Sequence, residues 1–559
     1  MTIFHCTFGL GSGSRRIQFL LLSLATVAPS LTAAHEGTHR KAQQQRRAAL
    51  ARAAARAEEP PQPHANQESC RLRVQLRNAS DGQPLPGILR ITNVDSEKAI
   101  PLPGEIHREL NWYAIQPDLM VTVPRTRIRV EAFHGLDRER VSRELDLTGM
   151  SQASVDILLR QFYDAKSQSL HSGNTHLHLM KMTYLEALEY LRTVPSADGL
   201  DLVFLSHLRR IPDERDYISN QVVENSFTGG ELQRLSRHGV LFGNGEEHRH
   251  NFGRGGEGYG HVMLLDLLRL IQPVSIGPGI MQDGTDWPPL RNGIRSARAD
   301  GATVIWCHNQ FGLERLPNWM TGELHAQNIF DGGDHGSYEE TFYRYLNLGL
   351  SVPFSTGTDW FIYDFSRVYV PVSEPLTTKN WLSALRSGKS YITNGPFLEL
   401  TLDDRPIGDT VALDAPRAVT IRGRGIGRSD FRRIELVHNG EVVRMAACRK
   451  LEGHFVADLE FSLPIREPGW VALRIPRDAG KNELDKPLFA HTSAIYLELE
   501  GRRIFRPEIA REMITEIETN QQKIVSEARF ANERDRDDVL RVHREGIESL
   551  RKRISQARP

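Results

Sequence analysis

The stretch Val304-Ile305-Trp306-Cys307-His308 is a short apolar run that ends in a histidine. The segment Leu202–His207, Leu-Val-Phe-Leu-Ser-His, has the same layout. Helical patterns such as Tyr184–Arg192 separate runs of this kind. Strands that are apolar throughout and alternate with helices are typical of a buried parallel sheet or barrel. We therefore predict an α/β barrel over residues 163–397.

The regions on either side of this barrel have the texture of β-domains. Leu72, Val74 and Leu76 alternate with polar residues, as in a half-buried strand, and we predict an N-terminal β-sandwich over 67–162. After the barrel, Asp403-Asp404 and Asn439-Gly440 are hairpin-type turns between alternating segments. They indicate a second small β-domain, of the sandwich type, over 398–500.

Residues 501–559 carry apolar side chains at helical spacing, among them Met513, Ile517 and Leu550. We expect a helical tail whose apolar face packs against the barrel, with a coiled-coil dimer as the alternative. The sequence specifies no oligomeric state.

The N-terminus has the three parts of an export signal. Arg15 and Arg16 precede an apolar run, Ile17–Ala28, and small residues suited to cleavage follow at Thr32-Ala33-Ala34. We predict a signal peptide over 1–34 and a disordered linker over 35–66, with a periplasmic or extracellular mature protein. The apolar run is shorter than the roughly 20 residues that cross a bilayer, so no stable membrane insertion is expected after cleavage. An uncleaved anchor and a start codon placed too early are the alternatives.

Composition narrows the choice of partners. Lys plus Arg equals Asp plus Glu at 70 each, so net charge favours no nucleic acid, and a small-molecule substrate is expected. Cys6 lies in the predicted signal, and the remaining cysteines, Cys70, Cys307 and Cys448, are too far apart for a disulfide framework. We interpret Cys307 as a buried strand-end cysteine rather than a metal ligand.

Several apolar runs of the middle region lead into residues that ligate metals. His176 and His178 form a His-x-His pair, and residues two apart on a strand face the same side. Phe242 leads through Gly-Asn-Gly into Glu246-Glu247, and Phe354 leads to Asp359. Barrel enzymes gather their active-site groups at the carboxyl ends of the strands. His261, which follows Gly260 and precedes an apolar stretch read as a helix from Val262, joins His308 as a further candidate.

The ordered set of these motifs resembles the PHP superfamily of metallohydrolases (polymerase and histidinol phosphatase domain), and within it the exported, carbaryl-hydrolase-like branch. The motifs are Ser172–His178, Asn244–Glu247 with Gly260-His261, Cys307-His308, Gly357–Trp360, Ser366–Tyr369, Arg386–Lys389 and Thr393–Pro396. The resemblance implies a distorted seven-stranded (β/α) barrel. It also implies metal ligation by His176, His178, Glu247, His261, His308 and Asp359, with Glu247 preferred to Glu246 and bridging two ions.

Two departures from the family pattern bear on the metal content. Ser206 precedes His207 where the family usually has Asp, and Trp360 and Phe361 follow Asp359 where it commonly closes with a further histidine. Both changes remove ligands that support a third metal, so we expect one or two divalent ions, Zn or Mn. Asn174 also replaces an Asp that often precedes the His-x-His pair.

The expected chemistry is attack by metal-activated water on an ester, amide or carbamate bond. Asp359 or His207 would accept the water proton, and Arg367 would hold an anionic substrate or form a structural ion pair. Trp306, Phe311, Trp360 and Phe361 are candidates for an apolar substrate wall. The alternatives are a PHP-type phosphoesterase, with Arg209 and Arg210 beside the metal, and a catalytically inactive protein whose β-domains bind glycan or polymer.

Overall fold

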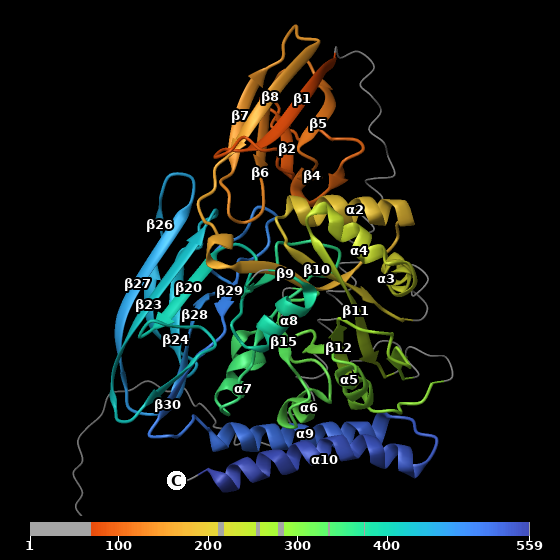
Figure 1. Cartoon of the computed structure of the whole chain (residues 1–559), viewed down its shortest axis with the longest axis vertical. Helices are drawn as coiled ribbons and strands as arrows, with labels where there is room; N and C mark the ends of the chain where they lie inside the picture. Colours follow the sequence, from red (N-terminus) through yellow and green to blue (C-terminus); the bar gives the residue numbers. More distant parts are fainter. Residues whose placement is uncertain are drawn as a thin grey trace, which may run out of the picture. The chain divides into compact units, whose positions relative to one another are not determined.

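The computed structural model describes residues 69–210, 217–252, 258–277, 284–333, 336–373 and 375–557 (Figure 1). The predicted signal peptide and linker lie outside these residues. The described chain falls within a single unit, Ser69–Pro559. None of its helices is long and apolar enough to span a membrane.

Two sheets near the N-terminus share one apolar core. In the first, β1 (Ser69–Asn78) pairs antiparallel with β5 (Asp118–Pro124) and parallel with β8 (Gln152–Leu159). Every second residue of β1 is buried, as the alternating sequence predicts. The second sheet has the order β3 (Ile106–His107), β4 (Tyr113–Ile115), β2 (Gly87–Asn93), β6 (Arg127–Phe133), β7 (Val141–Asp146). Side chains of β1, β2, β5 and β6 meet between the two sheets.

The central sheet begins with strand–helix alternation. The strands β9 (Leu170–His178), β10 (Leu202–His207) and β11 (Leu241–His250) are parallel neighbours. The helix α2 (Tyr184–Ala197) connects the first two strands, and α3 (Ile218–Gly229) and α4 (Glu231–Leu235) lie between the next two. A capping box starts α2. The side chain of Thr183 accepts from the backbone N–H of Glu186, and the Glu186 carboxylate accepts from the backbone N–H of Thr183.

Beyond β11 the strand pairing shows that the predicted seven-stranded (β/α) barrel is wrong. The strand β12 (Gly260–Leu265) runs antiparallel to both β11 and β14 (Thr303–Trp306), and β18 (Arg367–Pro371) runs antiparallel to β9. The described residues contain no helix between β11 and β12, or between β16 (Phe354–Ser355), β17 (Asp359–Trp360) and β18. The chain is mostly β, with 37% strand and 25% helix, and the sheet curls on without closing into a helix-covered barrel. Short apolar runs fit any buried strand, whichever way its neighbours run.

The curled sheet continues into the C-terminal β-region through β19 (Tyr391–Thr393) and β29 (Ala490–Thr492). That region also contains a sheet of β21 (Arg405–Pro406), β20 (Phe397–Leu402), β23 (Arg417–Gly427), β27 (Phe455–Ile465) and β26 (Arg449–Lys450). Its face packs on the strands β22 (Thr410–Leu413), β24 (Arg433–His438), β25 (Glu441–Ala447), β28 (Gly469–Ile475) and β30 (Ile495–Leu499).

The two hairpin turns predicted in this region are confirmed. Asn439 and Gly440 join β24 to β25 with φ of 54° and 102°, and Asp403 and Asp404 join β20 to β21 with φ of 45° and 62°. Positive φ at both central residues is the geometry that suits Asn, Asp and Gly in tight hairpins.

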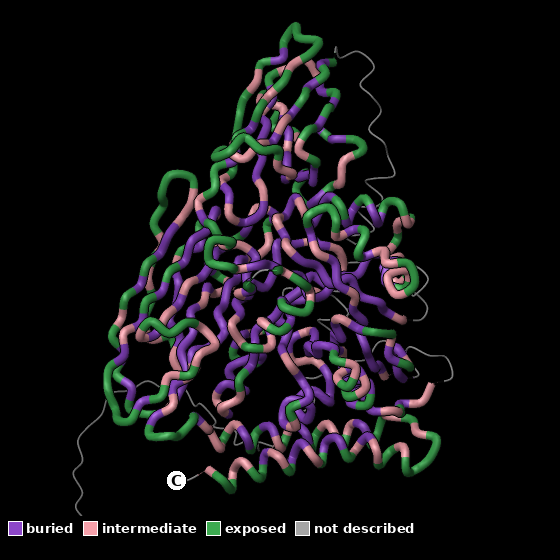
Figure 2. Tube along the Cα trace, in the orientation of Figure 1, coloured by how far each residue is buried: buried purple, intermediate pink, exposed green. Residues whose placement is uncertain are grey.

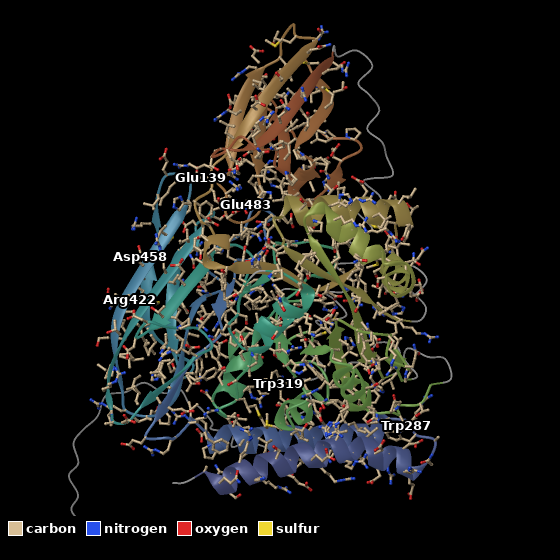
Figure 3. The ribbon with its side chains drawn as sticks, viewed as in Figure 1. Glu139, Trp287, Trp319, Arg422, Asp458 and Glu483 are labelled. Atoms are coloured by element: carbon tan, nitrogen blue, oxygen red, sulfur yellow. The ribbon has the colours of Figure 1, made fainter. Side chains whose placement is uncertain are left out.

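The C-terminal residues form a helical hairpin that packs on the central region, as the apolar spacing predicts. The helices α9 (Pro507–Glu527) and α10 (Glu533–Gln556) lie side by side beneath α5 (Leu290–Ala299) and α6 (Arg315–Met320) (Figure 1). Along both helices buried and exposed positions alternate (Figure 2). Trp287 lies close to the hairpin (Figure 3), and its indole N–H donates to Asp538 at 3.1 Å.

A buried ion pair ties the N-terminal sheets to the central region. Arg108 donates to both carboxylate oxygens of Asp198, at 2.7 and 3.2 Å, and the two side chains are 4% and 0% exposed. Asp198 follows α2, whereas Arg108 lies between β3 and β4.

Asp198→Ala should lower the free energy of unfolding by about 3–5 kcal/mol, because it leaves the Arg108 charge buried without its partner. Urea unfolding followed by circular dichroism measures this change. Asp118→Ala is the matched control, since it breaks the exposed Arg73–Asp118 pair between β1 and β5 and should leave the unfolding curve almost unchanged. Equal shifts for the two variants would contradict the assignment.

Candidate metal centre

The two histidines of β9 lie side by side in the interior. His176 and His178 have no exposed surface, and their Nε2 atoms are 3.1 Å apart. Both project from the same face of the strand, because side chains alternate along a β-strand. The predicted His-x-His pair is therefore present as one local unit at the carboxyl end of β9.

The alternation along β11 decides between the two neighbouring glutamates. Glu247 Oε2 lies 3.0 Å from His178 Nε2, so this carboxylate faces the β9 histidines. Glu246 points the other way, toward His248 Nδ1 at 3.0 Å and the backbone N–H of Ile271 at 2.7 Å. The carboxylate of the site is Glu247.

Glu247 also faces a second pair of histidines. Its Oε1 atom lies 3.0 Å from His261 Nδ1 and 3.5 Å from His308 Nε2. One carboxylate oxygen thus faces the β9 pair, and the other faces His261 and His308. In this position the carboxylate belongs to both groups of possible ligands.

His261 comes from a strand, not from the start of a helix as expected. It is the second residue of β12, where it pairs with Arg249 near the end of β11. Because β12 is antiparallel to β11, the beginning of β12 lies at the same sheet edge as the carboxyl end of β11. An antiparallel strand therefore delivers its ligand from its first residues and not from its last.

His308 and Asp359 reach the site from left-handed backbone, with φ of 55° and 61°. A conformation that is uncommon for residues with side chains often marks a functional position. Asp359 Oδ1 lies 3.4 Å from His176 Nε2 and 3.8 Å from His178 Nε2. Gly332 makes room for Asp359, because a Cβ at that position would lie 2.6 Å from its Oδ2 atom.

All six residues expected to be ligands come together as two groups that share Glu247. The first group is His176, His178, Glu247 and Asp359, and the second is Glu247, His261 and His308. Within each group the candidate ligand atoms all lie within 4.8 Å of one another. These buried groups can hold a metal ion.

The outer nitrogens of the four histidines fix which ring atom faces the centre. His176 Nδ1 donates to Asp331 Oδ2 at 2.9 Å, and His178 Nδ1 donates to the Ser206 carbonyl at 3.0 Å. His308 Nδ1 donates to the Asp331 carbonyl at 3.2 Å. Each ring therefore turns an unprotonated nitrogen inward in its neutral form.

The fourth histidine follows the same rule through an asparagine. His261 Nε2 donates to Asn251 Oδ1 at 3.3 Å, and this oxygen also accepts from Arg249 Nε at 3.0 Å. The Nδ1 atom of His261 is then the acceptor that faces Glu247. A proton can satisfy one such pair of acceptors, whereas a cation can satisfy the whole set.

Three buried atoms of the cluster support the same conclusion. Glu247 Oε1, His261 Nδ1 and Asp359 Oδ1 have no hydrogen-bond partner among the described residues. Glu247 Oε1 and His261 Nδ1 are only 3.0 Å apart and still form no hydrogen bond. Buried polar atoms normally have partners, so this donor set fits a divalent cation.

Charge at the site favours ionised Glu247 and neutral His261. Burial would raise the pKa of Glu247, but the charge of the Arg249 guanidinium and the close imidazoles of His176 and His178 hold it well below its usual range. Burial, and then the charge of Arg249, lower the pKa of His261 to about 3. A carboxylate and a neutral imidazole are the forms that bind metals.

Two residues expected to act in catalysis lie outside this cluster. His207 Nε2 bonds to Glu224 at 3.0 Å, and burial lowers the pKa of His207. Arg367 donates to the backbone carbonyls of Phe365 and Gly199 at 3.0 and 3.4 Å. Because Gly199 precedes β10, Arg367 reaches the end of this sheet opposite to the metal ligands.

Of the four wall candidates, Trp360 has a ring contact with a ligand histidine. Its ring centroid is 5.3 Å from that of His178, and Tyr217 stacks on its indole at 5.5 Å. Trp306 is fully buried and donates to the Phe311 carbonyl, and Phe361 packs on Tyr190. His248 and His250 are buried on β11.

Sequence reasoning missed three residues that support the ligands: Asp331, Asn251 and Arg249. Asp331 and Asn251 accept hydrogen bonds from ligand histidines. Arg249 Nη1 lies 3.6 Å from Glu247 Oε1. A signal for Asp331 was present, because this carboxylate closely follows β15 (Ala326–Asn328). Cys307 is buried as expected, and burial raises its pKa to about 12. Its sulfur nevertheless lies within 4.8 Å of ligand atoms of His176 and Asp331.

No protein-family model matches the chain, and no curated protein matches it. Among solved structures it is similar to β-glucuronidase 3 of Bacteroides uniformis, with 11% identity over 78% of this chain and 63% of that chain, and a TM-score of 0.15. A β-glucuronidase of Parabacteroides merdae gives 10% identity over 75% and 61%, with a TM-score of 0.15. The chain thus spans less than two thirds of either enzyme. A likeness this weak carries no argument about fold or activity.

Glu247→Gln should weaken the binding of a divalent cation by at least about 100-fold, because the amide removes the shared charge from both groups. Equilibrium dialysis against Zn²⁺ with elemental analysis measures this. Glu246→Gln is the matched control, since the neighbouring carboxylate faces His248 and Ile271 instead, and it should bind like the wild type. Equal loss in two folded variants would show that the alternation along β11 does not select the ligand.

Proposed function

We propose that this protein is a metal-dependent hydrolase whose centre is formed by the six residues described above. The observation that carries the proposal is the contact between His176 and His178, whose inward nitrogens lie 3.1 Å apart as acceptors. Such a contact is repulsive unless a proton or a metal cation lies between or beside the two atoms, and only a metal cation would also satisfy the nearby oxygens of Glu247 and Asp359. The ordered set of ligands also supports membership of the PHP superfamily, although the strand pairing differs from the barrel of that family.

Two ions are proposed, one in each group. Both carboxylate oxygens of Glu247 face ligand nitrogens, which supports a bridging role. Imidazole and carboxylate ligands suit Zn²⁺ and Mn²⁺, and either ion is compatible with this donor set. The residue at the usual position of a further aspartate, Ser206, contributes its backbone carbonyl to His178 and no ligand.

The residues of the site have separable roles in such a reaction. A bound divalent cation supplies Lewis acidity, which lowers the pKa of water and polarises the bond under attack. Asp359 is the proposed proton acceptor, because its Oδ1 atom is without a partner among the described residues and its side chain retains 8% exposure. His207, held by Glu224, is less suited to this role than the sequence alone suggested.

The preferred substrate is an ester, amide or carbamate of small or medium size. Trp360, with Tyr217 stacked on it, lies beside His178 and offers an apolar surface next to the first group. An aromatic surface close to the metal suits an uncharged organic substrate. Export to the periplasm or the outside of the cell is proposed from the sequence of residues 1–34 alone.

A phosphoesterase is the second candidate, and Arg249 favours it. This buried guanidinium lies 3.6 Å from Glu247 Oε1, and the charge of Arg210 is close enough to contribute, after burial, to lowering the pKa of Arg249. Positive charge beside a metal centre stabilises a phosphoryl group during transfer. In a phosphoesterase, Arg210 rather than Arg367 would supply the second positive charge.

Purified protein should hydrolyse aryl esters or carbamates in a metal-dependent manner, and His176→Ala/His178→Ala should abolish this activity. Assays of matched aryl-ester, aryl-carbamate and aryl-phosphate panels, with and without chelator, measure it. Arg249→Met separates the two candidates, because it should reduce kcat/KM for phosphates by at least about 100-fold and affect neutral esters less.

Activity on phosphates alone would reject the preferred substrate class and select the second candidate. Stoichiometric metal without hydrolysis of any panel would favour the third reading, an inactive binding protein. Retention of stoichiometric metal by the double histidine variant would reject the proposed centre itself.

A further inference from the structure

Asp331 lies behind both ligand groups and contributes no ligand to their shared centre. The residue is fully buried, three positions after β15. Its Oδ2 atom accepts from His176 Nδ1 at 2.9 Å, and its Oδ1 atom accepts from the backbone N–H of His308 at 2.9 Å. Its own carbonyl accepts from His308 Nδ1 at 3.2 Å.

These contacts make one residue responsible for a histidine in each group. His176 belongs to the group with His178 and Asp359, whereas His308 belongs to the group with His261. For both rings, Asp331 binds the nitrogen that faces away from the centre. The contacts fix the tautomer of each ring and the direction of its inward nitrogen.

We propose that Asp331 is a positioning residue shared by the two metal sites, and that it prepares both of them for ions at once. This inference rests on the proposed metal centre. Of the six proposed ligands, only Glu247 also acts on both groups. A ligand such as Asp359 acts on the first group alone.

The carboxylate is required because both of its oxygens act as acceptors. In Asp331→Asn one oxygen becomes an amide nitrogen, which donates and cannot accept. If the amide nitrogen faces His176, the ring must move its proton from Nδ1 to Nε2, which then cannot bind a cation. If the amide nitrogen faces His308, the backbone N–H of His308 loses its acceptor.

Asn328 supports this arrangement from the other side. Its amide N–H donates to Asp331 Oδ2 at 3.0 Å, so this oxygen is shared between Asn328 and His176. The Asn328 oxygen accepts from Thr175, the residue before His176. Loss of the Asn328 amide should therefore loosen the support of His176 and leave that of His308 in place.

Calorimetric titration of the metal-free full-length protein with Zn²⁺ tests the proposal. The wild type should bind two ions. Asp331→Asn removes one side-chain acceptor, whereas Asp331→Ala removes both, so Asp331→Ala should weaken both binding steps by about 10–100-fold. Asp359→Ala removes a carboxylate from a ligand of the first group, and it should weaken one step while leaving the other. Co²⁺ absorption spectra report the ligand geometry, which a general loss of stability would not change.

The outcomes distinguish failure of the metal centre from failure of the role of Asp331. A wild type that binds no Zn²⁺ rejects the metal centre, whereas two wild-type steps retained in folded Asp331→Ala reject the role of Asp331 alone. Weakening of only one step in Asp331→Ala also overturns the shared role. If Asp331→Ala does not fold, Asp331→Asn decides: loss of affinity in at least one step supports the proposal, and unchanged binding overturns it.

Discussion

The inward nitrogens of His176 and His178 face each other at 3.1 Å, in a place where water has no access. Two imidazole acceptors at this distance repel each other unless positive charge lies between or beside them. The surroundings are consistent with this requirement. Carboxylates from Glu247 and Asp359 approach the same point, and hydrogen-bond acceptors behind each ring keep the protons on the outer nitrogens.

The sheet satisfies this requirement without the regular architecture that the sequence suggested. Ligands come from parallel strands β9 and β11, from the antiparallel β12, and from left-handed residues at His308 and Asp359. What these positions share is one edge of a curled sheet. The direction of each strand matters less than which of its ends reaches that edge.

The features that the sequence predicted correctly are the local ones. The His-x-His pair depends only on the two-residue repeat of a strand, and the Asn439-Gly440 turn depends only on backbone preference. Strand direction was not predictable in this way. The run Val262–Leu265 suits a helix or a strand equally, and its pairing with β11 and β14 decides the outcome.

The same distinction explains the site. Glu247 and Glu246 are adjacent and chemically identical. Only their position along β11, paired with β12, decides that Glu247 faces the ligand histidines and that Glu246 bonds to His248. Asp331 and Arg249 act through groups that are distant in sequence, so no short motif contains them. Arg367, a strand residue with a plausible charge, was misplaced because its end of the sheet is set by pairing with β9.

The hairpin of α9 and α10 has a consequence for the order in which the molecule can be assembled. Met513, Ile517, Ile547 and Leu550 belong to the same apolar core as Val262 and Ile305 of the central sheet. Arg291 and Arg315 reach out of that core to Glu545 and Glu516. During synthesis, the faces of α5 and α6 that make these contacts therefore wait for residues 507–556 before they are covered. Until then these faces are open to chaperones and proteases.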